Sequence, residues 1–294
     1  MARVILIGAV RFSQRLVRVL HEGPLELVGV CTNARGFGSD ALDLRGLATE
    51  IGVDVLDSED INSPGSTSWI RARSPDLIVC AGWSRLLREE VLTIAPLGVL
   101  GYHPAGLPRN RGRHPIIWTL ALGLPEAGST FFLMDEGADS GPIVSQRSIP
   151  VRPRETADSL YGRLNDLAAE QLREIAEEID RKGSFTHHPQ DHSRATYWRK
   201  RTDRDGHIDW RMSAIVIDRL VRALSPPYPC AEFFVDGAPV RILESDLATG
   251  PVDIEPGRVL GVNGAHATIM TGDGAVRLRC DRELHGLISE GDAL

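Results

Sequence analysis

The chain has 294 residues, of which 42% are hydrophobic and 25% charged, so two domains with a core each are expected. Its formal net charge of −7 and pI near 5.7 give no overall basic surface, which disfavours nucleic acid as a partner. Apolar runs stay below the roughly 20 residues of a membrane span, and the first residues lack a secretory signal, so we expect a cytoplasmic protein without membrane contact.

The first hundred residues alternate between extended and helical patterns. The apolar run Val4 to Ile7 ends at Gly8, and helical spacing follows from Ser13 to Leu20. The later extended segments are 25–31, 53–56 and 77–81, and the later helical segments are 41–51 and 66–73. Strands alternating with helices predict an α/β fold with a doubly wound, mostly parallel, Rossmann-like sheet.

Ligands of such sheets bind beyond the carboxyl ends of the strands, so we expect the functional residues in the loops there. His103 follows an apolar strand and precedes Pro104, which places it on a strand-end loop. A basic loop, 109–115, then leads into a helical segment, 116–122, and favours an anion site. A strand at 129–134 ends in a glycine-containing loop that holds Asp139.

The second half of the chain changes character twice. A long amphipathic helix at 156–182 is followed by a polar stretch, and a further helix at 213–224 is ended by prolines. From residue 231 short extended pieces separated by Asp-Gly and Asn-Gly predict a small all-β, OB-like module. We therefore expect a catalytic domain at 1–186, a linker and helix at 187–230, and a β domain at 231–294.

The four cysteines, at positions 31, 80, 230 and 280, form no Cys-x-x-Cys pair. This spacing suggests neither a zinc site nor a redox dithiol, and we expect no metal site. Three of the cysteines lie in apolar, strand-like surroundings, where we expect buried, inert thiols.

Acyl transfer to an amine needs a base, a carboxylate that orients the base, and donors for the developing oxyanion. His103 and Asp139, on adjacent strand-end loops, would supply the first two. The alternative is that His103 bonds a backbone carbonyl and Asp139 caps a turn. The residue types alone leave both interpretations open.

The segment from Gly98 to Gly141 resembles the folate-dependent formyltransferases. Their signature is Asn-x-His, a Leu-Pro, an Arg-Gly loop and an Asp in Asp-x-Gly, and His103 and Asp139 fall on the signature His and Asp. Further stretches of the chain that resemble the family are 4–8, 83–87, 199–202, 209–210 and 225–229. The resemblance implies N10-formyltetrahydrofolate as co-substrate, bound by a set of residues comprising Arg85, Leu86, Leu87, Gly137 and Asp139.

One position departs from this signature, because Gly101 stands where the family has Asn. Loss of an oxyanion donor costs on the order of a hundredfold in rate. Asn110 and His114 in the basic loop are our candidates to replace it as part of the catalytic group. The departure also admits a catalytically impaired homologue that binds folate or nucleotide.

The details of the motifs look closer to the sugar-nucleotide N-formyltransferases of surface-glycan biosynthesis, which implies a nucleotide-linked amino sugar as acceptor. Cations and flat rings for a nucleoside diphosphate could come from Arg111, Arg113, Tyr197, Trp198, Lys200 and Arg201, unless the stretch is a solvated basic linker. The alternative acceptor, methionyl-tRNA, needs a basic surface, and residues 231–294 contain only five arginines and no lysine. A dinucleotide-binding oxidoreductase is disfavoured because residues 8–11 lack Gly-x-Gly-x-x-Gly. The sequence is also compatible with a homodimer.

Overall fold

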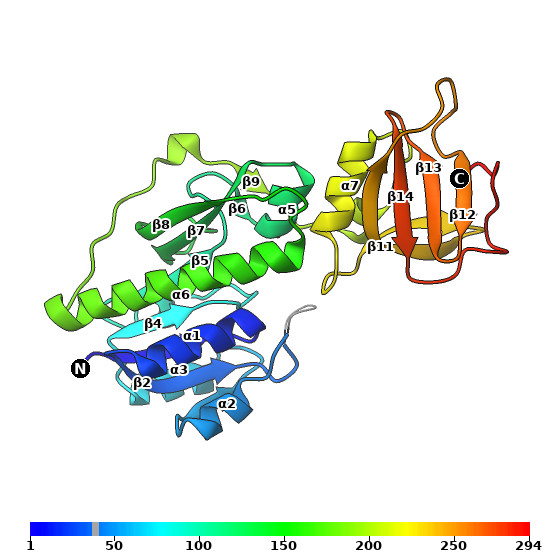
Figure 1. The fold of residues 1–294 in the computed structure, drawn as a ribbon. Helices are drawn as coiled ribbons and strands as arrows, with labels where there is room; N and C mark the ends of the chain where they lie inside the picture. Colours follow the sequence, from blue (N-terminus) through cyan, green and yellow to red (C-terminus); the bar gives the residue numbers. More distant parts are fainter. Residues whose placement is uncertain (37–40) are drawn as a thin grey trace. The chain divides into compact units, whose positions relative to one another are not determined.

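The computed structural model describes residues 1–36 and 41–294, which form two compact units (Figure 1). The first unit contains Met1–Pro115, Ala127–Ile149 and Gly162–Trp198, and the second contains Ile116–Glu126, Pro150–Tyr161 and Arg199–Leu294. Each unit has a sheet of its own.

The first unit is built on a seven-stranded sheet with the order β3-β2-β1-β4-β5-β7-β8. Pairing is parallel from β3 to β5, and β7 joins β5 in the antiparallel direction. The strands are β1 (Arg3–Ile7), β2 (Glu26–Thr32), β3 (Val55–Asp57), β4 (Leu77–Cys80), β5 (Val99–His103), β7 (Glu126–Leu133) and β8 (Ile143–Pro150). The mostly parallel sheet expected from the sequence is confirmed.

Helices cover both faces of this sheet. On one face lie α1 (Arg11–Glu22) and α6 (Ala157–Lys182), which run side by side and are joined by an ion pair between Arg15 and Asp166 at 2.6 Å (Figure 1). The Tyr102 ring faces this layer, with its centroid 4.6 Å from that of Phe12 in α1. Because side chains alternate along a strand, Gly101 and His103 point to the opposite face.

That opposite face packs against α3 (Pro64–Ala72) and α4 (Glu89–Leu92). Its core contains alternate residues of the central strands, such as Ile5, Ile78 and Val99, together with Ile70 from α3 and Val91 from α4. The central strands are buried on both faces, which explains why β4 reads as an uninterrupted apolar run.

The second unit contains a five-stranded antiparallel sheet with the order β10-β11-β14-β13-β12. Its strands are β10 (Ala231–Val235), β11 (Ala238–Ala248), β12 (Val259–Asn263), β13 (His266–Met270) and β14 (Ala275–Cys280). The unit also holds α7 (Ala214–Ala223), the 3-10 helix η2 (Asp203–Gly206) and all of α5 (Pro115–Ala121) except Pro115. The all-β module expected from the turn signals is confirmed.

Several elements differ from the sequence-based expectation. The helix expected at 41–51 is reduced to α2 (Arg45–Glu50), because Ala41 instead forms an isolated bridge with Val10. The short parallel pair β6 (Arg111–Gly112) and β9 (Tyr197–Trp198) and the 3-10 helix η1 (His192–Arg194) were not expected. Within the described residues, no helix is long and apolar enough to cross a membrane.

Candidate active site

His103 is the last residue of β5 and its side chain is buried, with 4% of the residue exposed. Its Nε2 lies 2.8 Å from the backbone oxygen of Asn110. A carbonyl oxygen only accepts hydrogen bonds, so Nε2 carries a proton in this arrangement. Nδ1 is then the nitrogen that faces the carboxylate of Asp139, with 3.5 Å between Nδ1 and Oδ2.

Asp139 lies in the loop between β7 and β8, and its backbone is in the left-handed region with φ +54°. Its Oδ2 accepts a hydrogen bond of 2.9 Å from the backbone N–H of Gly112. The loop is braced from inside, since the Asp135 carboxylate accepts from Gly137 N and Ser140 Oγ. A non-glycine residue adopts a positive φ only where its surroundings hold it there. The hydrogen bonds within the loop therefore fix the position of the Asp139 carboxylate.

The side chains of His103 and Asp139 form a mostly buried pair that can accept a proton. The distance of 3.5 Å between His103 Nδ1 and Asp139 Oδ2 is long for a direct hydrogen bond and short enough for strong electrostatic interaction. Both of the opposing sequence interpretations therefore describe part of the geometry, because His103 does bond a backbone carbonyl and also faces the carboxylate. The pair is suited to general acid–base chemistry at the sheet edge.

The basic loop is tied to β9 and supplies backbone groups to both members of the pair. Asn110 gives its carbonyl to His103, and Gly112 gives its N–H to Asp139. Asn110 N donates to Thr196 Oγ1 and the Asn110 Oδ1 accepts from the same hydroxyl, and the described hydrogen bonds leave the Nδ2 donor of Asn110 unused. Asn110 and His114 both have positive φ, at +62° and +57°.

Arg111, which the sequence assigns to the diphosphate of the acceptor, is buried, with only 1% of the residue exposed. Its guanidinium donates to Gln190 Oε1 and to the hydroxyl of Tyr197. Arg111 therefore links Gln190 and Tyr197 within the first unit. Arg113, in contrast, is exposed and reaches the carbonyl of Ser84 at 3.4 Å.

The space beside Gly101 is filled by neighbouring side chains. A Cβ added there would lie 2.7 Å from Met134 Cγ and 3.0 Å from Phe132 Cζ. Phe132 pairs directly with Gly101 across β5 and β7. The side-chain volume that the signature Asn would need is therefore taken by Met134 and Phe132.

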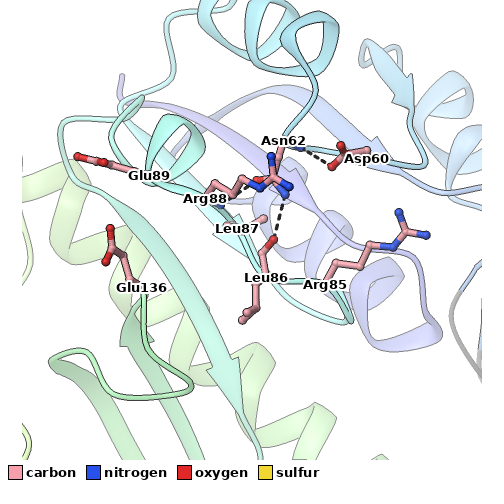
Figure 2. Close-up of a pocket in the computed structure, with 8 residues that line it drawn as sticks. All are labelled: Asp60, Asn62, Arg85, Leu86, Leu87, Arg88, Glu89 and Glu136. Carbon is pink, nitrogen blue, oxygen red and sulfur yellow. Dashed lines mark hydrogen bonds between the residues drawn. The ribbon is translucent and has the colours of Figure 1, made fainter.

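A pocket of about 660 Å³ lies beside the segment 85–88 (Figure 2). Figure 2 shows Asn62 next to this segment, where its Nδ2 donates to Leu86 O at 3.0 Å and its Oδ1 accepts from Arg88 N at 2.8 Å. Glu136, from the loop that also holds Asp139, contributes to the lining. The lining residues are Asp60, Asn62, Arg85, Leu86, Leu87, Arg88, Glu89 and Glu136.

This pocket brings together three of the residues expected to bind the co-substrate, Arg85, Leu86 and Leu87. Leu86 is 69% exposed, whereas Leu87 belongs to the core with 5% exposed. Gly137, also expected to bind the co-substrate, is exposed and follows Glu136 in the chain. The volume falls in the range of small-molecule sites.

The residues expected to contact the acceptor divide between the two units. Tyr197 and Trp198 belong to the first, and Tyr197 is 64% exposed although its hydroxyl is fixed by Arg111. Lys200 and Arg201 belong to the second, where Lys200 is exposed and Arg201 is 8% exposed.

Sequence reasoning missed Asn62 and Gln190, which hold the loops of the site. Gln190 is 6% exposed and donates to the carbonyls of Asp139 and Gly141. Neither residue lies in a periodic segment or a recognised motif, so the sequence carried no signal for its role.

All four cysteines are buried, whereas burial was expected for three of them. Burial raises the pKa of Cys80 and of Cys280 to about 12, and it also raises the pKa of Cys31 and Cys230. Among the described residues, no cluster of three or more His, Cys, Asp or Glu side chains could hold a metal ion.

The chain thus combines a doubly wound α/β unit, which has a His–Asp pair at its strand ends, with an antiparallel β module. Residues 3–175 match the formyl transferase family, and residues 200–284 match the formyl transferase C-terminal domain. The methionyl-tRNA formyltransferase of Roseiflexus sp. (strain RS-1) is 34% identical over 283 residues, covering 94% of this chain and 86% of that protein. The chain therefore belongs to the formyltransferase family, whose enzymes transfer one-carbon formyl groups.

Solved structures share the fold at lower identity. An N-formyltransferase from Helicobacter canadensis, in complex with folinic acid and dTDP-3-aminofucose, has a TM-score of 0.73 at 15% identity and covers 95% of this chain and 100% of its own. HypX from Aquifex aeolicus, in complex with tetrahydrofolic acid, has a TM-score of 0.65 at 23% identity. That match covers 94% of this chain but 43% of HypX, so it concerns less than half of that longer protein.

Proposed function

We propose that the chain transfers a formyl group from N10-formyltetrahydrofolate to the amino group of a nucleotide-linked amino sugar. The observation that carries this proposal is the facing pair of His103 Nδ1 and Asp139 Oδ2, in a unit whose pocket is lined by Arg85, Leu86 and Leu87. The folate would occupy that pocket, whose wall shares a loop with Asp139.

The folate supplies the formyl carbon when bound. The acceptor nitrogen forms a bond to that carbon, the bond from the carbon to the folate nitrogen breaks, and one proton moves from the acceptor to the folate nitrogen. In the proposed mechanism His103 Nδ1 takes this proton while Asp139 stabilises the charged ring, and the proton is then returned to the leaving nitrogen. The Nδ2 donor of Asn110 is our candidate for the formyl oxygen, in place of the side chain that Gly101 lacks.

The charge of the β strands and loops at residues 231–294 supports a small acceptor. Residues 231–294 contain eleven acidic and five basic side chains, a formal net charge of −6. Four of the five arginines are ion-paired with carboxylates, as in the pairs of Arg279 with Glu244 and of Arg277 with Asp246. A carboxylate beside an arginine lowers the local positive potential that would attract a polyanion such as tRNA.

Methionyl-tRNA is the second candidate acceptor, because the 34% identical relative is named for that activity. The two acceptors can be separated in one assay. The purified chain is incubated with 10-formyltetrahydrofolate and either a panel of nucleotide-linked amino sugars or methionyl-tRNA, and products are weighed by mass spectrometry. Formylation of the tRNA alone would overturn the sugar assignment and leave the proposed site standing.

The site itself is tested by His103→Asn and Asp139→Asn. Loss of a general base removes about 10²- to 10⁴-fold in rate, so kcat should fall by that order in His103→Asn. His21→Asn is the matched control, because His21 is an exposed residue in the last turn of α1. Undiminished turnover in a folded His103→Asn variant would overturn the proposed mechanism.

A further inference from the structure

Gln190 is a buried amide whose hydrogen-bonding groups are all engaged. Its Nε2 donates to Asp139 O at 3.0 Å and to Gly141 O at 2.6 Å. Its Oε1 accepts from Arg111 Nε at 3.2 Å and from Arg111 Nη2 at 2.6 Å. A primary amide offers two N–H donors and two acceptor lone pairs, so all four are used.

One of the two hydrogen bonds that Gln190 donates ends on Asp139, the residue that carries the carboxylate of the site. Asp139 has φ +54°, a conformation that an L-residue adopts only where the surroundings hold it. The amide of Gln190 holds the carbonyl of this residue and, through Gly141, the far end of its turn. Gln190 therefore holds the backbone from which the Asp139 side chain extends, without touching the carboxylate itself.

Arg111 links the same amide to the other half of the site. Its guanidinium is oriented by the Tyr197 hydroxyl at 2.8 Å, and its backbone N–H donates to Thr196 O at 2.9 Å. The residues on either side of it are Asn110, whose carbonyl meets His103 Nε2, and Gly112, whose N–H meets Asp139 Oδ2. One fixed arginine thus places backbone groups against both members of the pair.

We propose that Gln190 is a positioning residue that sets the Asp139 carboxylate against His103, with Arg111 aligning the Gln190 amide. The proposal rests on the proposed function of the His103–Asp139 pair. The two carbonyls of Asp139 and Gly141 require two N–H donors from residue 190, whereas the opposite end of its side chain faces the positive charge of Arg111. Glutamate at position 190 would keep the interaction with Arg111 and lose both N–H donors. It therefore separates the contribution of the two donors from that of the contact with Arg111.

Gln190→Glu should retain the fold, because its carboxylate would pair with the buried guanidinium of Arg111. The carbonyls of Asp139 and Gly141 would then face an anionic oxygen, and the turn should shift. A displacement of about 1 Å can cost about a hundredfold in rate, so kcat should fall about tenfold to a hundredfold with KM for the folate within about twofold. Gln190→Met, similar in shape without hydrogen bonds, should lower kcat likewise and serves if the Glu variant does not fold.

Gln171→Glu is the matched control. Gln171 is a fully buried amide in α6 whose bonds go to Ser129 and Ser145. It tests whether any glutamate buried in this unit lowers kcat. A fall in kcat equal to that of Gln190→Glu would overturn the proposal.

Two readouts distinguish positioning from general stability. Amide hydrogen exchange at Gly112 and at residues 137–141 should accelerate in both Gln190 variants, because the Gly112 N–H is bonded to Asp139 Oδ2. In an Asp139→Asn background, Gln190→Glu should lower kcat by less than about twofold, since it acts through a carboxylate already removed. Unchanged exchange, or a full additional loss of kcat in that background, overturns the proposal.

The outcomes also separate this inference from the proposed function. If His103→Asn and Asp139→Asn keep full activity, the proposed mechanism fails while accelerated exchange still shows that Gln190 holds the turn. If both lose activity and the Gln190 variants keep wild-type kcat and exchange, the mechanism stands and the positioning role fails.

Discussion

At Gly112 the backbone has φ +104°, and a Cβ would lie 2.3 Å from the carbonyl oxygen of Trp198 in β9. The obstructing atom belongs to the backbone of the strand that pairs with β6, so it cannot swing aside. The N–H of Gly112 also holds the Asp139 carboxylate. A side chain here therefore disturbs the β6–β9 pairing and the site at once.

We expect Gly112→Ala to lower the free energy of unfolding by about 1–3 kcal/mol or more and to lower kcat. The matched substitution is Gly162→Ala in α6, where the glycine is exposed and an added Cβ would meet no atom within 4 Å. That change should raise the free energy of unfolding by about 0.5–1 kcal/mol, because alanine favours a helix. Urea denaturation of both variants measures these values, and a neutral Gly112→Ala would contradict the account.

Among the elements, β5 contains the one position, Gly101, that departs from the family signature. Because Met134 Cγ lies 2.7 Å from the Cβ position of Gly101, Gly101→Asn should overpack the sheet and cost about 1–3 kcal/mol. In a Met134→Ala background the same substitution should cost clearly less, and the coupling is read from a double-mutant cycle of unfolding free energies. Equal costs in the two backgrounds would show that Met134 does not occupy this space.

The elements that the sequence predicted well are those with a periodic apolar pattern. The helix expected at 156–182 is α6 (Ala157–Lys182), and the apolar run at 77–81 is β4 (Leu77–Cys80). The antiparallel direction of β7 escaped prediction because it depends on tertiary pairing, and the apolar pattern of a strand carries no direction. The β6–β9 pair escaped because two-residue strands have no period to detect.

For the candidate site, the sequence pointed to two side chains and to none of the groups that hold them. His103 and Asp139 were found through the spacing of a resembling motif, and the structure brings Nδ1 and Oδ2 within 3.5 Å. The groups that hold them, Gln190 and the backbone carbonyl of Asn110, were not predicted from the sequence. The position of a backbone carbonyl or of an amide side chain in a loop depends on the tertiary fold rather than on residue type. The burial of Arg111 likewise follows from tertiary pairing with β9.

At the scale of the whole molecule, buried acids with raised pKa values govern stability at high pH. Burial raises the pKa of Cys80 from its usual 9.0 to about 12, and it raises the pKa of Cys31 and of Tyr102 as well. Above about pH 9 the unfolded chain releases thiol protons that the folded chain keeps, so the folded state then binds more protons than the unfolded state. Stability should therefore be insensitive to these thiols below pH 9 and fall as the pH rises toward 12.

Each such thiol contributes a slope of about 1.4 kcal/mol per pH unit in that window. We expect the urea midpoint to decrease steadily above about pH 9, and Cys80→Ala to flatten the decrease by about one thiol's share. The variant loses some stability at neutral pH from the cavity it leaves, so the slopes rather than the midpoints are compared. Parallel slopes in the wild type and Cys80→Ala would mean that the Cys80 thiol keeps its ordinary pKa in the folded chain.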